Sequence, residues 1–382
     1  MKVLVTDGKY KHSLGIVRAL GKSGIRPIVI SLKKGSLSSK SKYCQKEYVT
    51  VDYQSEEFES QFIDILKNEK IDLVMPVGVD AFRKLIDLKD KIEIYSKFVS
   101  VNVEKMNLCL SKKLTYQFAE NIGIPVPKTK YPTSLLDVEI IGEEISYPCV
   151  IKWLYEVGGN IVEYAYNKQE LISKYGEVCE RYGFNEHTGF PLIQEYIRGK
   201  GCGFFAVYNN GQCGSTFQHL RIREYPVTGG ASAAAESYRN NKVQEYGKKL
   251  LDSLEWHGVA MVEFKLTDEG EPVLMEVNPK FWGSTDLCIE AGVNMPELLT
   301  TIAKGEDVVY SEKYKFPFRY HWPLQGEYKV LLSDKSKLFE ILVDIFNPKV
   351  KSNIWFFSDV VPTLYMIAQF INSILGRIFK NG

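Results

Sequence analysis

The first hundred or so residues alternate short apolar runs with amphipathic segments, and this alternation constrains the fold more than any other feature of the chain. We predict strands at 3–5, 27–30 and 72–77, with helices at 15–21 and 58–68. Strands that alternate with helices are typical of a parallel sheet with crossover helices. We therefore expect a Rossmann-like domain over roughly residues 1–105. The turn after the first strand lacks a G-x-G-x-x-G fingerprint, which disfavours an NAD-dependent oxidoreductase.

The rest of the chain mixes strands and helices less regularly, as an α+β region does. We expect helices at 108–123, 171–182 and 243–254. Strands are expected at 148–153, 192–197, 204–208, 213–220, 260–266 and 272–278.

Length, charge and cysteine content narrow the class of protein. The chain has 382 residues, which is enough for two or three domains. A net charge of +1 gives no strong field for nucleic acid, so we expect no nucleic-acid partner. Seven cysteines are scattered without a C-x-x-C pair, which indicates reduced thiols and a cytoplasmic protein. The first apolar run is too short for a signal peptide.

Two strand-like runs flank a polar turn that contains Gly270, which predicts a β-hairpin. Glu276 and Asn278 are two residues apart on the second strand, so their side chains share one face. Folding the hairpin brings Glu263 of the first strand near Glu276. Three oxygen donors in one place are typical ligands of Mg²⁺, with Mn²⁺ as a substitute. The alternative is a carboxylate pair bonded to a nearby arginine or lysine.

Two further segments have the chemistry of a nucleotide site. Lys152 ends a predicted strand and is followed by Gly158 and Gly159, a combination that suits phosphate oxygens. The alternative is a solvated lysine, and the segment has no Walker A pattern. Gln194-Glu195-Tyr196-Ile197 ends another strand and could line a flat aromatic ring. The alternative there is an ordinary edge strand.

A basic segment follows later in the chain. His219, Arg221 and Arg223 alternate along a predicted strand, so we expect them to face one side and to attract anions. Gly229 and Gly230 then offer a flexible loop of backbone donors. The alternative is a solvated face whose ion pairs contribute little to stability.

The order of these features, more than any one of them, resembles the ATP-grasp superfamily over roughly residues 1–320. The closest likeness is to the branch described as predicted ATP-dependent carboligases. That branch has a similar H-x-R-x-R-E-x-P-x-x-G-G run, here starting at His219, and a similar N-P-[RK]-F-W-G-S run, here starting at Asn278.

The resemblance implies a division of the chain into an N-terminal Rossmann-like (pre-ATP-grasp) domain, a small lid, a larger subdomain with the metal site, and a helical extension. The boundaries we expect are 1–107, 108–192, 193–325 and 326–382. The resemblance also implies an ATP-dependent carboxylate ligase. Such an enzyme activates a carboxylate as an acyl phosphate, joins it to an amine, and releases ADP and phosphate. Its partners are a small-molecule carboxylate and an amine.

The resemblance also assigns roles to residues. It implies that Lys112 and Lys152 contact the nucleotide phosphates and that the Gly158–Gly159 loop covers them. The segment from Gln194 to Ile197 becomes the adenine hinge. The metal ligands are implied to be Glu263, Glu276 and Asn278. The resemblance implies that Arg221 and Lys280 are catalytic. It also implies that the acceptor substrate is bound by His219, Arg223, Gly229 and Gly230.

Three positions depart from the family pattern. Ser111 stands where members often carry aspartate, and the acid expected to contact the ribose falls near Cys202. Lys280 replaces an arginine, which keeps the charge but loses the bidentate geometry. We weigh two alternatives to the ligase. A phosphotransferase on the same fold stays open, and a non-catalytic nucleotide-binding regulator is disfavoured because Glu263, Glu276 and Asn278 are all present.

The last predicted element is a helix over 360–380. Its apolar residues follow helical spacing on one stripe, and polar residues interrupt the run, so we expect no transmembrane span. We expect the helix to pack on the protein itself or on a second subunit of a homo-oligomer. The alternative is peripheral contact with a membrane surface.

Overall fold

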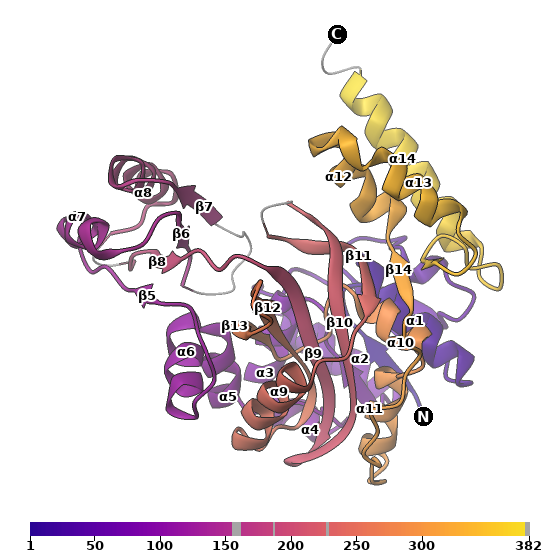
Figure 1. Ribbon diagram of the computed structural model, residues 1–382. Helices are drawn as coiled ribbons and strands as arrows, with labels where there is room; N and C mark the ends of the chain where they lie inside the picture. Colours follow the sequence, from indigo (N-terminus) through magenta and orange to yellow (C-terminus); the bar gives the residue numbers. More distant parts are fainter. Residues whose placement is uncertain (155–161, 186–187, 227–228, 379–382) are drawn as a thin grey trace. The chain divides into compact units, whose positions relative to one another are not determined.

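The computed structural model describes residues 1–154, 162–185, 188–226 and 229–378. The chain folds into two compact units (Figure 1). The first, here called unit 1, comprises Met1–Val103, Cys202–Met261 and Asn278–Gly382. The second, unit 2, comprises Glu104–Gly201 and Val262–Val277. The four-part division expected from the resemblance stays a prediction.

Unit 1 begins with a parallel sheet in the order β3-β2-β1-β4. Its central strands are short, β-branched and fully buried, as expected for strands covered on both faces. The expected Rossmann-like sheet is therefore confirmed. Its elements are β1 (Val3–Val5), α1 (Lys11–Lys22), β2 (Ile28–Ser31), β3 (Lys46–Val49), α2 (Glu57–Glu69), β4 (Leu73–Met75), α3 (Val79–Asp87) and α4 (Lys89–Glu93).

Helix α2 shows why this sequence forms these elements. Phe58, Phe62, Ile65 and Leu66 are its buried residues, and their spacing forms one apolar stripe. Acidic residues occupy its first turn, where they complement the helix dipole. The helix ends at Lys70, which adopts the left-handed conformation with φ of 51°.

A second sheet of unit 1 contains the strand order β9-β10-β11-β14-β15. The β9–β10 and β10–β11 pairs are antiparallel. The strands are β9 (Lys200–Asn209), β10 (Gln212–Tyr225), β11 (Ala231–Ser237), β14 (Arg319–His321) and β15 (Lys351–Ser352). An apolar core between this sheet and the first one includes Ile16, Phe205, Trp282, Leu287 and Trp322.

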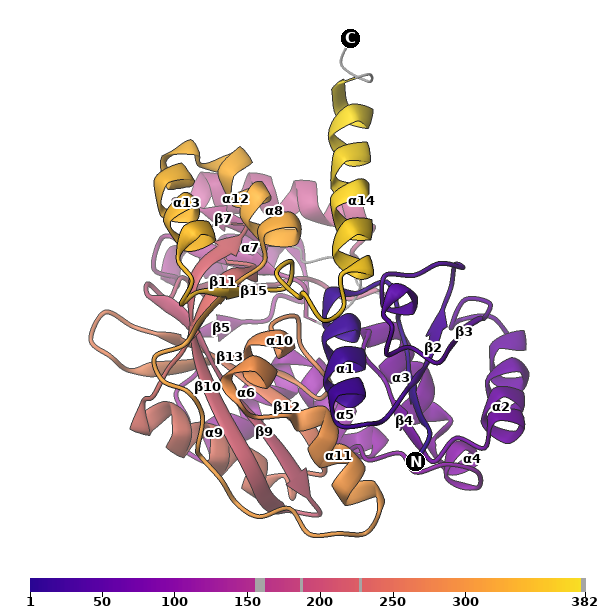
Figure 2. The ribbon, with the colours of Figure 1, turned by 90° about the vertical axis from the view of Figure 1, so that its right-hand side faces the viewer.

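The helices of unit 1 that follow β11 are α9 (Asn241–Ser253), α10 (Thr285–Ala291), α11 (Met295–Ala303), α12 (Tyr328–Ser333), α13 (Leu338–Phe346) and α14 (Val361–Ile378). A π-helical turn, Pro323–Glu327, precedes α12. Helix α14 confirms the predicted C-terminal helix. It begins beside α1, where Met366 packs with Leu14, and its later turns extend away from the rest of the unit (Figure 2).

Unit 2 contains a small antiparallel sheet in the order β5-β8-β6-β7. Helices α7 and α8 pack against it through Val138, Ile141, Leu171 and Tyr175 (Figure 1). The elements are α5 (Val103–Leu110), α6 (Lys112–Asn121), β5 (Thr129–Lys130), α7 (Leu135–Glu144), β6 (Cys149–Lys152), β7 (Val162–Ala165), α8 (Lys168–Tyr182) and β8 (Leu192–Glu195).

Strands β12 (Gly258–Leu266) and β13 (Pro272–Asn278) form the predicted hairpin. Thr267 N donates to Glu271 O at 2.9 Å, and Gly270 N donates to Thr267 O at 2.9 Å. Gly270 has a φ of 85°, which glycine adopts without strain. The turn therefore forms where its sequence signal predicted it.

One predicted helix is wrong in its extent. The single helix expected at 108–123 is two helices, α5 and α6, which are separated at Ser111. The Ser111 hydroxyl accepts a hydrogen bond from Leu114 N at 3.4 Å and so caps α6. A serine in an apolar periodic run is compatible with both a helix interior and a helix start, so the spacing did not reveal the break.

Candidate functional site

Lys152 is the centre of a hydrogen-bonded group in unit 2. It ends β6, and its Nζ donates to Gln194 Oε1 of the neighbouring strand β8 at 2.9 Å. Gln194 is fully buried, and its Nε2 donates to Thr129 Oγ1 at 2.9 Å and to Tyr116 OH at 3.2 Å. Tyr116 OH in turn donates to Met275 O on β13 at 2.9 Å. The Lys152 ammonium is thus held by a buried amide that is itself fixed on two sides.

The two hairpin carboxylates, Glu263 and Glu276, act electrostatically on the hydrogen-bonded group around Lys152. Glu276 Oε2 lies 4.0 Å from Lys112 Nζ at the start of α6. Burial raises the pKa of Tyr116, and the charges of Glu276 and Glu263 raise it further against the hydrogen bond from Gln194. Glu263 and Glu276 therefore both act on Tyr116 through their charges.

The pKa of Lys152 falls to about 8. Burial is the main cause, and the charge of Lys112 adds to it, while Glu276 and Glu263 act in the opposite direction. A lysine in this state needs a further negative charge to become fully protonated above neutral pH. The arrangement suits an anionic ligand such as a phosphate.

The predicted adenine hinge follows Gln194. The Glu195 side chain accepts from Lys128 N at 2.8 Å, and Glu195 N donates to Lys128 O at 3.0 Å. Lys265 Nζ donates to Ile197 O at 2.9 Å and lies 4.6 Å from the ring centroid of Tyr196. Among the described residues, Ile197 N finds no hydrogen-bond acceptor. This leaves one backbone donor of the segment available to a ligand.

The donor set of the predicted metal site fits a hard cation in its chemistry. Glu263 and Glu276 supply two carboxylates in unit 2, and Asn278, two residues later in β13, begins the third segment of unit 1. Asn278 Oδ1 accepts from Lys280 Nζ at 3.3 Å. In the described part of the chain, no group of three or more His, Cys, Asp and Glu side chains could hold a metal. The candidate set is two carboxylates and one amide.

The basic segment of the sequence lies on β10 in unit 1. His219 is buried, and both burial and the charge of Arg221 lower its pKa to about 3, so its imidazole is neutral. Arg221 NH1 lies 3.3 Å from Glu224 Oε2. Irregularities in the β10–β11 register fall between Arg221 and Arg223 and again between Arg223 and Glu224. The strict alternation on which the sequence argument relied is interrupted there.

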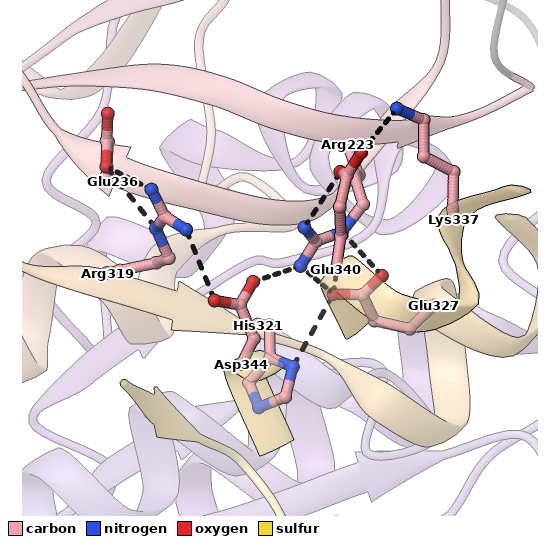
Figure 3. Close-up of polar contacts among 8 residues, drawn as sticks. All are labelled: Arg223, Glu236, Arg319, His321, Glu327, Lys337, Glu340 and Asp344. Carbon is pink, nitrogen blue, oxygen red and sulfur yellow. Dashed lines mark hydrogen bonds and ion pairs between the residues drawn. The ribbon is translucent and has the colours of Figure 1, made fainter. Parts of the chain in front are cut away.

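Arg223 belongs to a buried group of ion pairs (Figure 3). Its guanidinium donates to Glu327 Oε1 at 2.7 Å, to Glu327 Oε2 at 2.9 Å, and to Asp344 of α13. Burial alone would lower the pKa of Arg223, but Glu327 and Asp344 outweigh burial and raise it. The guanidinium is therefore bound by carboxylates of the protein itself.

The two predicted glycine loops have different outcomes. Gly158 and Gly159 lie outside the described residues. Gly229 has a φ of 134° and its N donates to Pro226 O at 3.1 Å. A Cβ on Gly230 would lie 2.2 Å from Tyr225 O, so only glycine fits in this turn. The need for glycine at Gly230 has a local steric cause.

Sequence reasoning missed Tyr116, Thr129 and Lys265, which hold the Lys152 group and the hinge together. No motif marked them, because each acts through a partner more than 60 positions away in the chain. Tyr116, in the middle of a predicted amphipathic helix, has the pattern of an ordinary core residue.

The chain is similar to known proteins in both its sequence and its structure. The family described as "ATP-grasp in the biosynthetic pathway with Ter operon" matches residues 220–325. The chain is similar to biotin carboxylase from Campylobacter jejuni, with a TM-score of 0.68 at 17% identity, over 83% of this chain and 74% of that one. The chain has the ATP-grasp fold.

A second solved structure supports the same fold. N5-carboxyaminoimidazole ribonucleotide synthetase from Thermotoga maritima matches with a TM-score of 0.59 at 19% identity, over 83% of this chain and 79% of that one. The mixed α/β and α+β fold class predicted from the sequence is thereby confirmed, as is the resemblance to the superfamily.

Among curated proteins, the chain is similar to the carbamoyl phosphate synthase large chains of Halomonas eurihalina and Clostridium acetobutylicum. Identity is 26% over 309 residues for the first and 24% over 351 residues for the second. These matches cover 75% and 88% of this chain but only 27% and 30% of the relatives. The chain therefore spans less than a third of the length of either relative.

Proposed function

We propose that this protein is an ATP-dependent carboxylate ligase of the carbon–nitrogen bond-forming type. It activates a small carboxylate as an acyl phosphate, transfers the acyl group to an amine, and releases ADP and phosphate. The observation that carries the proposal is the Lys152–Gln194–Tyr116 group beside Glu276 and Lys112 on an ATP-grasp fold. Two cations and two carboxylates around a buried amide suit a nucleotide triphosphate with its metal.

ATP is proposed to bind along unit 2. Lys112 and Lys152 contact the phosphates, because both ammonium groups lie near the carboxylates that would hold the metal. Gln194, Glu195, Tyr196 and Ile197 form the adenine hinge, and the available N–H of Ile197 supports this assignment. The roles of Gly158 and Gly159 over the phosphates rest on the family pattern alone.

Mg²⁺, or Mn²⁺ in its place, is proposed to bind through Glu263, Glu276 and Asn278. Their oxygen donors match the preference of these ions. When bound, such an ion screens the charge of the phosphate oxygens. Lys112, 4.0 Å from Glu276, and Lys152 supply fixed positive charge from the protein itself.

The acyl-transfer side is proposed to lie in unit 1. Arg221 and Lys280 stabilise the charge of the acyl phosphate, and His219, Gly229 and Gly230 contribute to the acceptor pocket. Arg223 has a different role in this proposal. Because Glu327 and Asp344 bind its guanidinium, it positions β10 behind these residues.

Two other functions use the same nucleotide site. A phosphotransferase would release the phosphorylated product, and a regulator would bind ATP without turnover. The regulator is disfavoured because Glu263, Glu276 and Asn278 are all present, together with Lys112 and Lys152. Analysis of the reaction product distinguishes the ligase from a phosphotransferase. ATP turnover distinguishes the ligase from a regulator.

The deciding experiment measures ADP and phosphate release from Mg·ATP with a mixed panel of carboxylates and amines. We expect release that depends on a carboxylate, and about 100-fold or greater loss in Glu276→Gln. Glu269→Gln, in the exposed turn of the same hairpin, is the matched control and should behave as wild type. Full turnover by Glu276→Gln would refute the proposed mechanism.

We further propose a cytoplasmic location, supported by the seven cysteines, all of which are free thiols. Its partners are proposed to be small molecules, without nucleic acid. None of the helices in the described residues is long and apolar enough to cross a membrane. Peripheral membrane contact, or subunit contact in a homo-oligomer, is proposed for α14, supported by exposed Leu364, Ile371 and Leu375. Phe379 and Lys380 at the end of the predicted helix lie outside the described residues.

A further inference from the structure

Helix α13 of unit 1 is amphipathic in the reverse sense for a helix at the surface of a folded protein. Its buried residues are Ile341 and Asp344, and the guanidinium groups of Arg223 and Arg319 bind Asp344 (Figure 3). The side that faces away from the unit, here called the outer face of α13, carries apolar residues that are each at least 40% exposed: Leu338, Phe339, Leu342, Val343 and Phe346. A surface helix normally turns such residues inward, as α2 does.

The exposure of this outer face is large for side chains of this kind. Phe339 is 77% exposed and Phe346 is 80% exposed, so nothing in the described part of the chain covers them. Single exposed apolar residues are ordinary, whereas several together mark a contact surface. The outer face of α13 therefore has the composition of a surface that is covered in use.

Helix α14 adds a second apolar stripe at the same end of unit 1 (Figure 1, Figure 2). Its exposed apolar residues recur at helical spacing: Leu364, Ile367, Ile371, Ile374 and Leu375. The ring of Phe370 lies 5.1 Å from the ring of Tyr328 in α12, which holds one side of α14 against the unit. Two helices of the C-terminal segment thus expose apolar stripes.

Lysines border the outer face of α13 at both ends. Two belong to the 3-10 turn directly before the helix, and two follow the helix: Lys335, Lys337, Lys349 and Lys351. Asp344 is buried between arginines, and Glu340 accepts from Lys337 Nζ at 2.8 Å. In residues 334–351, all of which the structure describes, Asp334 and Glu340 are the surface acids that oppose the four lysines. The border of the outer face is therefore positively charged.

The charge of this border decides between two partners of the outer face. An anionic lipid surface matches an apolar face with a lysine border, because phenylalanines enter the interfacial region while lysines reach the phosphates. A second copy of the chain matches it less well. In a two-fold contact both copies use the same patch, so the lysines of one copy would approach those of the other.

We propose that the outer face of α13, together with the exposed stripe of α14, docks unit 1 on an anionic membrane surface. Phe339 and Phe346 enter the interfacial region, and the bordering lysines contact the lipid phosphates. This inference goes beyond the ligase proposal and does not depend on it, because none of these residues belongs to the proposed nucleotide or acceptor sites.

The test is sedimentation of the full-length protein with vesicles of phosphatidylcholine alone or of phosphatidylcholine mixed with phosphatidylserine. The variant carries Phe339→Ser with Phe346→Ser. Its matched control carries Leu136→Ser with Ile140→Ser, two exposed apolar residues of α7. We expect wild type and control to bind the mixed vesicles, and the α13 variant to bind them at least about tenfold more weakly.

A second pair of variants tests the lysine border. Lys335→Gln with Lys349→Gln should weaken binding to the mixed vesicles about tenfold or more, and raised salt should weaken wild-type binding in the same way. Lys304→Gln with Lys313→Gln, exposed lysines elsewhere in unit 1, should bind as wild type. All these side chains lie at the surface, so every variant should keep the wild-type midpoint of thermal unfolding and its affinity for MgATP.

Three outcomes would overturn the inference. They are equal vesicle binding by wild type and the Phe339→Ser, Phe346→Ser variant, no binding of wild type to either kind of vesicle, and self-association of wild type that this variant loses without any lipid binding. The last outcome would assign the outer face to a second copy. Carboxylate-dependent turnover could be present in all three cases, and vesicle binding without turnover would refute only the ligase.

Discussion

At the scale of single residues, Lys152 shows how burial prepares a charge for a ligand. Its ammonium is held by Gln194, and burial with the neighbouring Lys112 lowers its pKa to about 8. A bound triphosphate would favour the protonated form and raise that pKa again. Binding of MgATP should therefore be linked to proton uptake above pH 8.

The prediction concerns the dissociation constant of MgATP between pH 7 and pH 9. In the free protein Lys152 is protonated below pH 8 and loses its proton above it, so affinity should fall as pH rises. With a free-protein pKa of about 8 and a much higher pKa in the complex, Kd should rise about fivefold between pH 8 and pH 9. Isothermal titration calorimetry at several pH values measures this slope.

The matched variant for this prediction is Lys152→Arg. Arginine keeps its charge throughout this range, so the variant should show a flat profile even where its affinity is lower. If the arginine variant kept the wild-type slope, the proton would have to come from another group.

Sequence reasoning reached the residues with distinctive chemistry and missed those that position them. Lys152 and Gln194 belonged to recognisable local patterns at the ends of strands. Tyr116 and Thr129 had no such signal, because their role depends on the register that places Gln194 opposite Thr129 and Val150. That register depends on the packing of the whole small sheet, which no local spacing encodes.

At the scale of elements, strand β10 was predicted from the sequence. The buried ion pairs of Arg223, here called the anchor of β10, were not. Strand periodicity identified the basic residues, but the register irregularities around Arg223 and the carboxylates that bind it were not visible in the sequence. Glu327 and Asp344 lie 104 and 121 positions further along the chain, in a π-helical turn and in α13. Arg319 of β14 donates to the other Asp344 oxygen at 3.2 Å (Figure 3). The anchor thus joins the C-terminal elements of unit 1 to its sheet.

Replacing Arg223 by methionine should destabilise unit 1 strongly. Glu327 and Asp344 are 1% and 2% exposed, and without the guanidinium their charges would be buried with fewer partners. Removing one member of a buried ion pair typically costs about 3–5 kcal/mol. We expect a loss of this size in the free energy of unfolding, measured by chemical denaturation.

Glu340→Gln is the control for the Arg223 prediction. Its side chain is half-exposed, 3.7 Å from Arg223, and it also pairs with Lys337 at 2.8 Å. An exposed pair of this kind contributes under about 1 kcal/mol. If Arg223→Met and Glu340→Gln lowered the free energy of unfolding by similar amounts, burial would not determine how much these ion pairs contribute to stability.

At the scale of the whole molecule, the C-terminal segment of unit 1 closes onto its first helix. Arg18 of α1 and Asp359 are both buried, and Arg18 Nε donates to Asp359 Oδ2 at 2.9 Å. Ser41 Oγ donates to the same oxygen at 2.8 Å, and Lys42 N donates to Asp359 Oδ1 at 2.9 Å. The Arg18–Asp359 pair spans 341 positions of the chain, so only the folded structure reveals it.

Helix α14 begins within the same contact and then leaves it. Met366 packs with Leu14 of α1 and with Leu37, and all three are buried. Further along, Ile367, Ile371 and Leu375 are exposed. The sequence predicted one continuous apolar stripe, whereas the structure divides the helix into an anchored start and an exposed remainder.

Two deletions should therefore differ sharply. Removing 354–382 takes away Asp359 and Met366, which leaves Arg18 buried without its carboxylate. We expect the free energy of unfolding to fall by about 3–5 kcal/mol, which would be measured as a lower midpoint temperature of thermal unfolding. Removing 368–382 keeps both anchors, so the unfolding midpoint should stay close to that of the full chain. If the longer deletion unfolded at the same midpoint temperature as the full chain, the Arg18–Asp359 contact would contribute little to stability.

The shorter deletion is consequently the one that can test α14 as a contact surface. Sedimentation with anionic vesicles and the oligomeric state are compared for the full chain and for the chain without 368–382. We expect vesicle binding or self-association of the full chain to be reduced in the deletion, because it removes exposed apolar residues and leaves the folded unit intact. With the longer deletion, loss of binding would not distinguish a missing surface from an unfolded protein.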